Sequence, residues 1–209
     1  MPSWNIHLEA GHRLNQKLKF SGQNQKEFLL GCILPDINNG YVNHAKIIKP
    51  QEYTHYIHDG ESPGNFYTEY KNAINRKTPI FLGYLFHLYA DSFFNYRFRK
   101  AIDSSQTYGG LSADEQLKLK HHDYWLYDQN FAHTPGIHTS KEAKELAKTS
   151  NQIARISIAG EDLEEVERIF ESGILRQKSN PPYIFYTEQQ LDTILDDMIK
   201  SFTKDYLGE

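Results

Sequence analysis

The 209-residue sequence contains a single cysteine, Cys32. One cysteine excludes an internal disulfide and is typical of proteins from a reducing compartment. Its neighbours Leu29, Leu30 and Ile33 are apolar, so the thiol is predicted to be buried and chemically inert.

Long hydrophobic runs are also missing. The longest apolar stretches, around residues 28–34 and 80–86, fall far short of the roughly 20 residues that a membrane-spanning helix needs. The first residues show no basic segment followed by a long apolar run, so no secretory signal is expected. Together with the cysteine content, this predicts a cytoplasmic protein.

The sequence has no excess of positive charge. Its 23 lysines and arginines face 27 aspartates and glutamates, for a net charge of -4. Binding to a nucleic-acid backbone depends on lysine and arginine displacing counterions, so no nucleic-acid partner is expected. Hydrophobic residues at 39% and charged residues at 24% are ordinary for a globular protein, and the length predicts a single domain over residues 1–209.

Alternating strand patterns, internal repeats and low-complexity tracts are absent from the sequence, whereas helical patterns are frequent. The predicted fold class is therefore all-α, a single-domain multi-helix bundle.

In residues 3–19 one apolar stripe repeats at helical spacing and includes His7, whereas His12 falls on the opposite, solvated face. A second helix is expected to end near Leu34, because Pro35 disfavours the helical conformation in the residue before it. Residues 35–64 are rich in turn-forming residues and predict a long loop.

Four further helix starts follow from capping patterns. Thr78-Pro79 begins a helix that is expected to reach about residue 102, since threonine caps well and proline suits the first helical position. Pairs with the spacing of a capping box predict three more helices, after Ser112 with Glu115, Thr139 with Glu142, and Thr187 with Gln190.

The most informative pattern is His87 with Asp91 on the helix from residue 79. The run 80–91 is apolar on nearly every face, so both side chains are expected to be buried, and a spacing of four places them on one face. A buried carboxylate needs compensation. A divalent cation such as zinc supplies this compensation, because imidazole nitrogen and carboxylate oxygen are good zinc ligands. The alternative is that the two groups bond to each other or to nearby tyrosines, without a metal.

Three more residues from separate elements could reach the same centre. Asp36 follows Pro35, His55 lies at the far end of the predicted loop, and His7 faces inward from the first helix. Gly83, one turn before His87, would leave room for a ligand-bearing loop to approach. Three histidines and two aspartates suffice for one closed metal site and part of a second.

The sequence resembles the zinc-dependent phospholipase C family, which also includes the catalytic domain of a glycosylphosphatidylinositol-specific phospholipase D. The resemblance covers roughly the first half of the chain and rests on four segments: Trp4-Asn5-Ile6-His7, Gly31-Cys32-Ile33-Leu34-Pro35-Asp36, Thr54-His55-Tyr56 and Phe81-Leu82-Gly83-Tyr84-Leu85-Phe86-His87-Leu88-Tyr89-Ala90-Asp91. It implies an all-helical fold with zinc between the helices and hydrolysis of phosphodiesters of lipid headgroups or similar small molecules.

The resemblance also implies roles for particular residues. The residues expected to hold one metal are Asp36, His55, His87 and Asp91. His7 is expected to hold another, with Asp91 bridging the two ions, and by analogy His122 and Asp123 fill remaining metal positions. Two or more zinc ions are possible, with manganese or iron as alternatives.

Two positions depart from the family pattern. Trp4, whose counterpart begins the mature chain in secreted members, follows three residues here, and Arg97 stands near the place of a further family histidine. A reduced metal site is therefore expected.

The expected chemistry is metal-assisted hydrolysis, in which the cations lower the pKa of bound water, and Asp36 is the candidate general base. The second hypothesis is a metal-dependent phosphohydrolase of the HD class, whose adjacent His-Asp pair is matched by His122-Asp123. The third is a non-enzymatic helical module with one structural metal.

Overall fold

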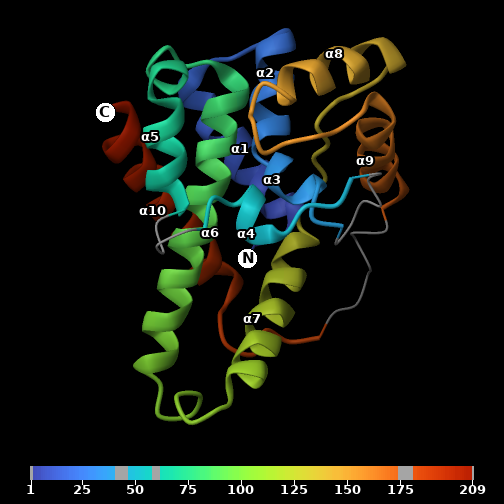
Figure 1. The fold of residues 1–209 in the computed structure, drawn as a ribbon. Coiled ribbons are helices and arrows are strands. Elements are labelled where there is room, and N and C mark those ends of the chain that lie inside the picture. The colour runs from blue at the N-terminus through green and yellow to red at the C-terminus, as the bar shows by residue number, and fades with distance from the viewer. Residues whose placement is uncertain (1, 41–46, 58–61, 174–180, 209) are drawn as a thin grey trace.

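The computed structural model describes residues 2–40, 47–57, 62–173 and 181–208. Within these ranges the chain forms helices and no strand, which confirms the predicted all-α class (Figure 1). In chain order the helices are α1 (Trp4–Leu18), α2 (Gly22–Gly31), α3 (Leu34–Ile37), α4 (Gln51–Thr54), α5 (Ser62–Asn75), α6 (Pro79–Asp103), α7 (Ala113–Asp128), α8 (Ser140–Ser150), α9 (Gly160–Ser172) and α10 (Glu188–Phe202), the last continuing as a short π-helix over Thr203–Leu207.

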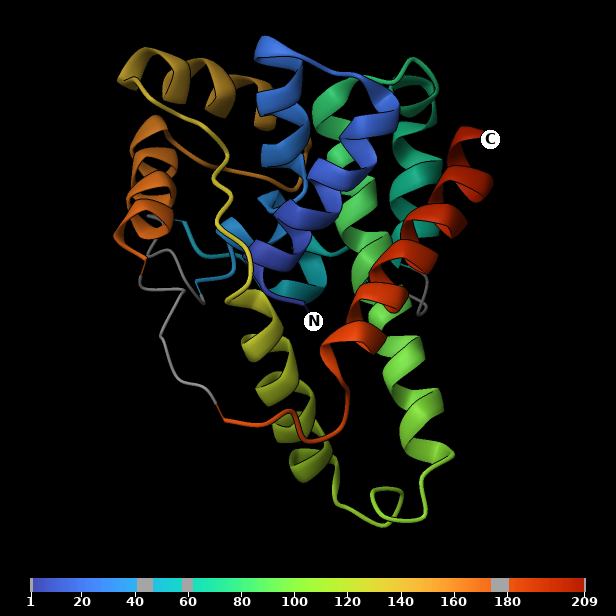
Figure 2. The same cartoon turned by 180° about the vertical axis from the view of Figure 1, so that it is seen from behind.

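Helix α6 is the centre of the bundle. Its residues from Ile80 to Leu88 are all buried, as the apolar sequence predicts for a helix surrounded by others. It packs against α1, α2, α3, α5 and α10. Figure 1 shows α5 beside its upper half, and Figure 2, from behind, shows α1 and α10 on its other side. Side chains on this helix can therefore meet groups from distant parts of the sequence.

The predicted helix starts are confirmed. The side chains of Ser112, Thr139 and Thr187 each accept a hydrogen bond from the backbone N–H three residues later. Helix α6 begins at Pro79 as predicted, although the Thr78 side chain makes no capping hydrogen bond. The first helix is capped in the same way by Ser3. Each cap satisfies a backbone donor that the helix itself leaves free.

The segment around Pro35 differs from the prediction. Helix α2 ends at Gly31, earlier than expected, and Pro35 lies in the first turn of a separate short helix, α3. Proline is tolerated there because the first helical N–H groups have no intrahelical partner. The predicted loop of residues 35–64 was also wrong in part, since it contains α3, α4 and the start of α5. Its residues 41–46 and 58–61 lie outside the described ranges.

Two glycines let α2 and α6 touch at the backbone. A Cβ atom at Gly83 would lie 2.1 Å from the Phe28 carbonyl oxygen, and one at Gly31 would lie 2.5 Å from that of Ile80. No other residue type fits this crossing without displacing a helix. The space at Gly83 is thus taken by helix α2, not by the ligand-bearing loop that we expected.

Cys32 is fully buried at the end of α2, and burial raises the pKa of its thiol, in agreement with an inert side chain. Among the described residues, no helix has the length and apolar character that would be needed to cross a membrane.

Candidate metal centre

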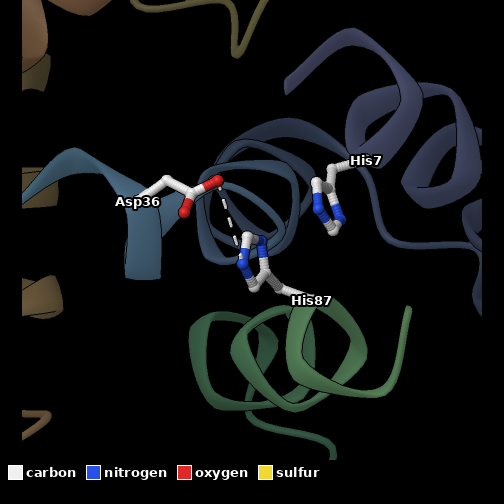
Figure 3. Close-up of side chains that lie close together, drawn as sticks. All are labelled: His7, Asp36 and His87. Carbon is white, nitrogen blue, oxygen red and sulfur yellow. Dashed lines mark ion pairs between the residues drawn. The ribbon is translucent and has the colours of Figure 1, made fainter. Parts of the chain in front are cut away.

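Five of the predicted ligands lie in one buried cluster. The cluster brings together one residue from each of α1 and α3, the residue that follows α4, and two residues from α6: His7, Asp36, His55, His87 and Asp91. None of them is more than 7% exposed. Figure 3 shows three of them, with Asp36 and the ring of His7 on either side of His87. The cluster contains two overlapping groups of three possible ligands: His7, Asp36 and His87, and His55, His87 and Asp91.

The donor atoms are spaced as ligands of a common ion would be. His55 Nε2 lies 3.3 Å from Asp36 Oδ1, 3.4 Å from Asp91 Oδ2 and 3.2 Å from His87 Nε2. His87 Nε2 lies 3.6 Å from Asp91 Oδ2 and 3.9 Å from Asp36 Oδ2. Two ligands about 2.0–2.1 Å from a tetrahedral ion stand roughly 3.3 Å apart. Most of these distances are longer than a good hydrogen bond and close to that value.

Hydrogen bonds at the far side of two rings aim their Nε2 atoms into the cluster. The Nδ1 atom of His87 lies 2.8 Å from the carbonyl oxygen of Cys32, and that of His55 lies 3.1 Å from the carbonyl oxygen of Gln51. A carbonyl only accepts, so Nδ1 carries the proton in both rings. This arrangement, a ring N–H bonded to a backbone carbonyl, is the usual support of a metal-binding histidine.

Several buried polar atoms in the cluster have no hydrogen-bond partner. They include His7 Nε2 and both carboxylate oxygens of Asp91, although His7 Nε2 is only 3.4 Å from Asp91 Oδ1. Unsatisfied buried polar atoms are uncommon and each one needs an explanation. Hydrogen bonds from nearby tyrosines do not satisfy these atoms, because the Tyr84 hydroxyl donates to the Thr54 carbonyl and the Tyr56 hydroxyl donates to the Tyr70 hydroxyl. The donor set therefore fits a zinc ion better than a closed hydrogen-bond network.

The charges in the cluster favour the ionised state of both carboxylates. Burial raises the pKa of Asp91, but the nearby imidazoles of His87 and His55 hold it well below its usual value. The pKa of Asp36 is lowered in the same way. Burial lowers the pKa of His87 to about 3. Burial also acts on His55, yet the carboxylates of Asp36 and Asp91 outweigh it and raise its pKa to about 10. Two anions thus attract one positive charge between them.

His122 and Asp123 belong to neither group of possible ligands. The Asp123 carboxylate is buried and accepts hydrogen bonds from three consecutive backbone N–H groups, those of residues 184–186, at 2.7–2.8 Å. His122 Nε2 lies 3.2 Å from the Pro182 carbonyl oxygen. Both side chains tie α7 to the segment that leads into α10. Arg97 bonds to Asp197 of α10 at 2.6 Å.

The sequence model of the zinc dependent phospholipase C family matches residues 6–207, nearly the whole chain. The chain belongs to this family. No curated protein and no solved structure matches it. Membership of the zinc dependent phospholipase C family extends the resemblance well beyond the first half of the chain, and the buried histidine and aspartate groups are compatible with a metal-dependent, phospholipase-like hydrolase.

Two supporting residues were not predicted from the sequence. Asn38, two residues after Asp36, donates to the Ser157 carbonyl at 2.8 Å and accepts from the Ser157 N–H at 3.0 Å. The Arg155 guanidinium lies 3.7 Å from the centre of the Tyr56 ring and donates to the Tyr53 carbonyl at 3.2 Å. The connection between α8 and α9 therefore holds the two segments that carry Asp36 and His55. No spacing pattern in the sequence indicates these contacts.

The backbone beside His55 has an unusual conformation that this support stabilises. Tyr56 has a φ of 55°, which is rare for a residue with a large side chain. Its carbonyl accepts from Asn65, and the His55 carbonyl accepts from the Ser62 hydroxyl. Strained conformations of this kind persist only when their surroundings fix them.

Proposed function

We propose that the protein hydrolyses phosphodiester bonds in phospholipid headgroups or in chemically similar small molecules. In this proposal Asp36, His55, His87 and Asp91 hold one zinc ion, and His7 with Asp91 contributes to a second. The observation that supports it most directly is the 3.2–3.9 Å spacing of five pairs of donor atoms from α3, α6 and the residue after α4. His122 and Asp123 have no ligand role in it.

Zinc, when bound, supplies a Lewis acid for a phosphoryl oxygen and a water of lowered pKa. The chain's own residues supply position and proton transfer. Asn39 Nδ2 donates to Asp36 Oδ1 at 2.9 Å and so orients that carboxylate. Asp36 and Asp91 are 7% and 6% exposed, and both carboxylate oxygens of Asp91 are buried. Asp36 is the proposed acceptor of the proton from the attacking water.

A non-catalytic module with a structural metal is the main competitor, and metal content alone does not separate it from an enzyme. The purified zinc-loaded protein should therefore be assayed with bis-p-nitrophenyl phosphate and with a soluble short-chain phosphatidylcholine. Turnover of either diester, lost on chelation and restored by zinc, supports the enzyme. Tightly bound zinc without turnover of any diester overturns the proposal.

Asp91→Asn tests the centre itself, because it keeps the shape of the side chain and removes the charge that two metal positions would share. We expect at least a 100-fold drop in turnover and a lower zinc content, measured by elemental analysis. His122→Ala is the matched control, since His122 lies outside the cluster. Equal losses in both variants would contradict the assignment of the site.

A further inference from the structure

Exposed apolar side chains gather in one short segment beside the metal centre. Seven large hydrophobic residues of the described ranges are strongly exposed, and four of them lie within residues 47–57: Ile47 at 46%, Ile48 at 54%, Tyr53 at 43% and Ile57 at 45%. These four residues form what we call the 47–57 patch. Single exposed apolar residues are ordinary, but several within one short segment make it a candidate interaction surface.

Backbone hydrogen bonds hold the patch in place. The Ile47 carbonyl accepts from Asn38 Nδ2 at 2.9 Å, and the Lys49 N–H donates to the Asn38 carbonyl at 2.7 Å. The Ile57 N–H donates to the Glu52 carbonyl at 2.9 Å. The exposed side chains are thus presented by a fixed main chain, which lowers the entropy lost on binding.

The same contacts connect the patch to the metal centre. Asn38 is two residues from Asp36, and Tyr53 and Ile57 each lie two residues from His55. The segment that carries the patch therefore also carries His55, and it is hydrogen-bonded to Asn38, two residues after Asp36.

The polar neighbours of the patch suit a phospholipid surface. The Lys49 ammonium lies 5.5 Å and the Arg155 guanidinium 5.2 Å from the centre of the Tyr53 ring. Tyrosine is enriched at the lipid headgroup level, where its ring enters the interface, and the two cations beside it would meet phosphates there. The isoleucines would enter the acyl boundary.

We propose that the 47–57 patch docks the protein on the surface of a phospholipid bilayer and so brings headgroup phosphodiesters to the metal centre. The inference rests on the proposed function for its substrate but not for its binding step, because docking requires no turnover. A soluble diester assay tests catalysis without vesicles, and vesicle binding tests docking without catalysis. The two proposals can therefore fail separately.

The experiment is flotation of the full chain with phosphatidylcholine vesicles, in metal-free and zinc-loaded form. We expect wild-type protein to float in both forms. Ile47→Ser combined with Ile48→Ser should lower the partition coefficient roughly tenfold or more, because it removes two apolar side chains from the interface. Ile57→Ser is a second, independent variant with the same expected direction. Circular dichroism and zinc content confirm that the variants are folded.

Ile184→Ser is the matched control, since Ile184 is also an isoleucine, at 47% exposure, outside the patch. Its flotation should equal that of wild type. Absence of flotation in the wild type, or equal losses in control and patch variants, would overturn the proposal. The proposal would also be overturned if the wild type were a dimer that does not bind vesicles and the double variant were a monomer. The patch would then be an interface between protein chains.

Discussion

The Nε2 atoms of His55 and His87 face each other at 3.2 Å, although both rings already give their Nδ1 protons to backbone carbonyls. Two nitrogen lone pairs at this distance repel unless a positive charge lies between them. The negative carboxylates of Asp36 and Asp91, which also lie close to His55 Nε2, further favour a positive charge at this position. Either a proton on His55 or a metal ion supplies the charge, so metal binding competes with protonation.

Removal of the metal should destabilise the protein. A ligand present at about 1,000 times its Kd stabilises the native state by about 4 kcal/mol, which for a chain of this size corresponds to a Tm shift of roughly 8 °C or more. We expect a chelator to lower the Tm by this amount and added zinc to restore it, measured by calorimetry. Asp91→Asn should show little further response to the chelator. If the Tm of the wild type were the same with and without chelator, metal binding would not stabilise the folded state as predicted.

Gly83→Ala should be severely destabilising. Its Cβ would lie 2.1 Å from the Phe28 carbonyl oxygen, and backbone atoms cannot move aside as a flexible side chain can. The helices would have to separate, at a cost of about 3 kcal/mol or more in the free energy of unfolding, measured in urea. Because the same crossing sets the Cys32 carbonyl against His87, zinc affinity should fall as well.

Gly110→Ala is the control for this substitution, because an added Cβ there meets no atom within 4 Å. Its unfolding free energy should stay within about 0.5 kcal/mol of wild type. If Gly83→Ala were equally mild, α2 and α6 would not be in backbone contact as described.

His12 should make stability depend on pH. The residue was predicted to be solvated, but it is partly buried and lies beside His133, with ring centres 4.1 Å apart and ring planes tilted by 34°. Burial, helped by His133, lowers its pKa from 6.5 to about 4, although Glu9 acts in the opposite direction. The unfolded chain therefore binds more protons between these values, and the folded state loses stability as pH falls from about 6.5 to about 4.

Urea unfolding of wild type and His12→Asn at pH 7 and pH 5 measures this effect. The drop in unfolding free energy should be smaller in the variant by about 1 kcal/mol, after allowance for solvent screening of a partly exposed group. Between pH 7.5 and 8.5 the two curves should run parallel, since His12 is neutral in both states. A drop of the same size in both proteins would show that His12 does not titrate as described.

Arg155 should position His55 without touching the metal. Arg155→Met keeps the aliphatic stem but removes the contact with the Tyr56 ring and the hydrogen bond to the Tyr53 carbonyl. We expect zinc affinity to fall roughly tenfold and the visible spectrum of the cobalt-substituted protein to change, since support of a ligand typically contributes 10–100-fold in affinity. Arg155→Lys should recover part of both.

The matched control for this prediction is Arg168→Met, since the Arg168 side chain is 67% exposed and pairs with Glu165 on the surface of α9. Affinity and spectrum should equal those of wild type. An unchanged cobalt spectrum in Arg155→Met, with only a lower Tm, would assign Arg155 a purely structural role.

The sequence by itself determined the helical class, the helix starts at Ser112, Thr139 and Thr187, and the burial of His87 and Asp91. These features are local, because caps act over three residues and the apolar residues of α6 themselves predict that the helix is buried. The sequence also indicated Asp36, His55 and His7 as partners, first through their positions in separate elements and then through the family resemblance. Local patterns could not decide between the two faces of α7, which left His122 and Asp123 as candidates.

The tertiary structure alone decided what those residues contact. Asp123 binds the backbone of residues 184–186, more than 60 positions away, and Arg155 supports a histidine 100 positions earlier. The distances between the donor atoms also depend on how α1, α3 and α6 cross, and the glycines at residues 31 and 83 set part of that geometry. Such contacts join segments with no shared periodicity, so only the packed chain determines them.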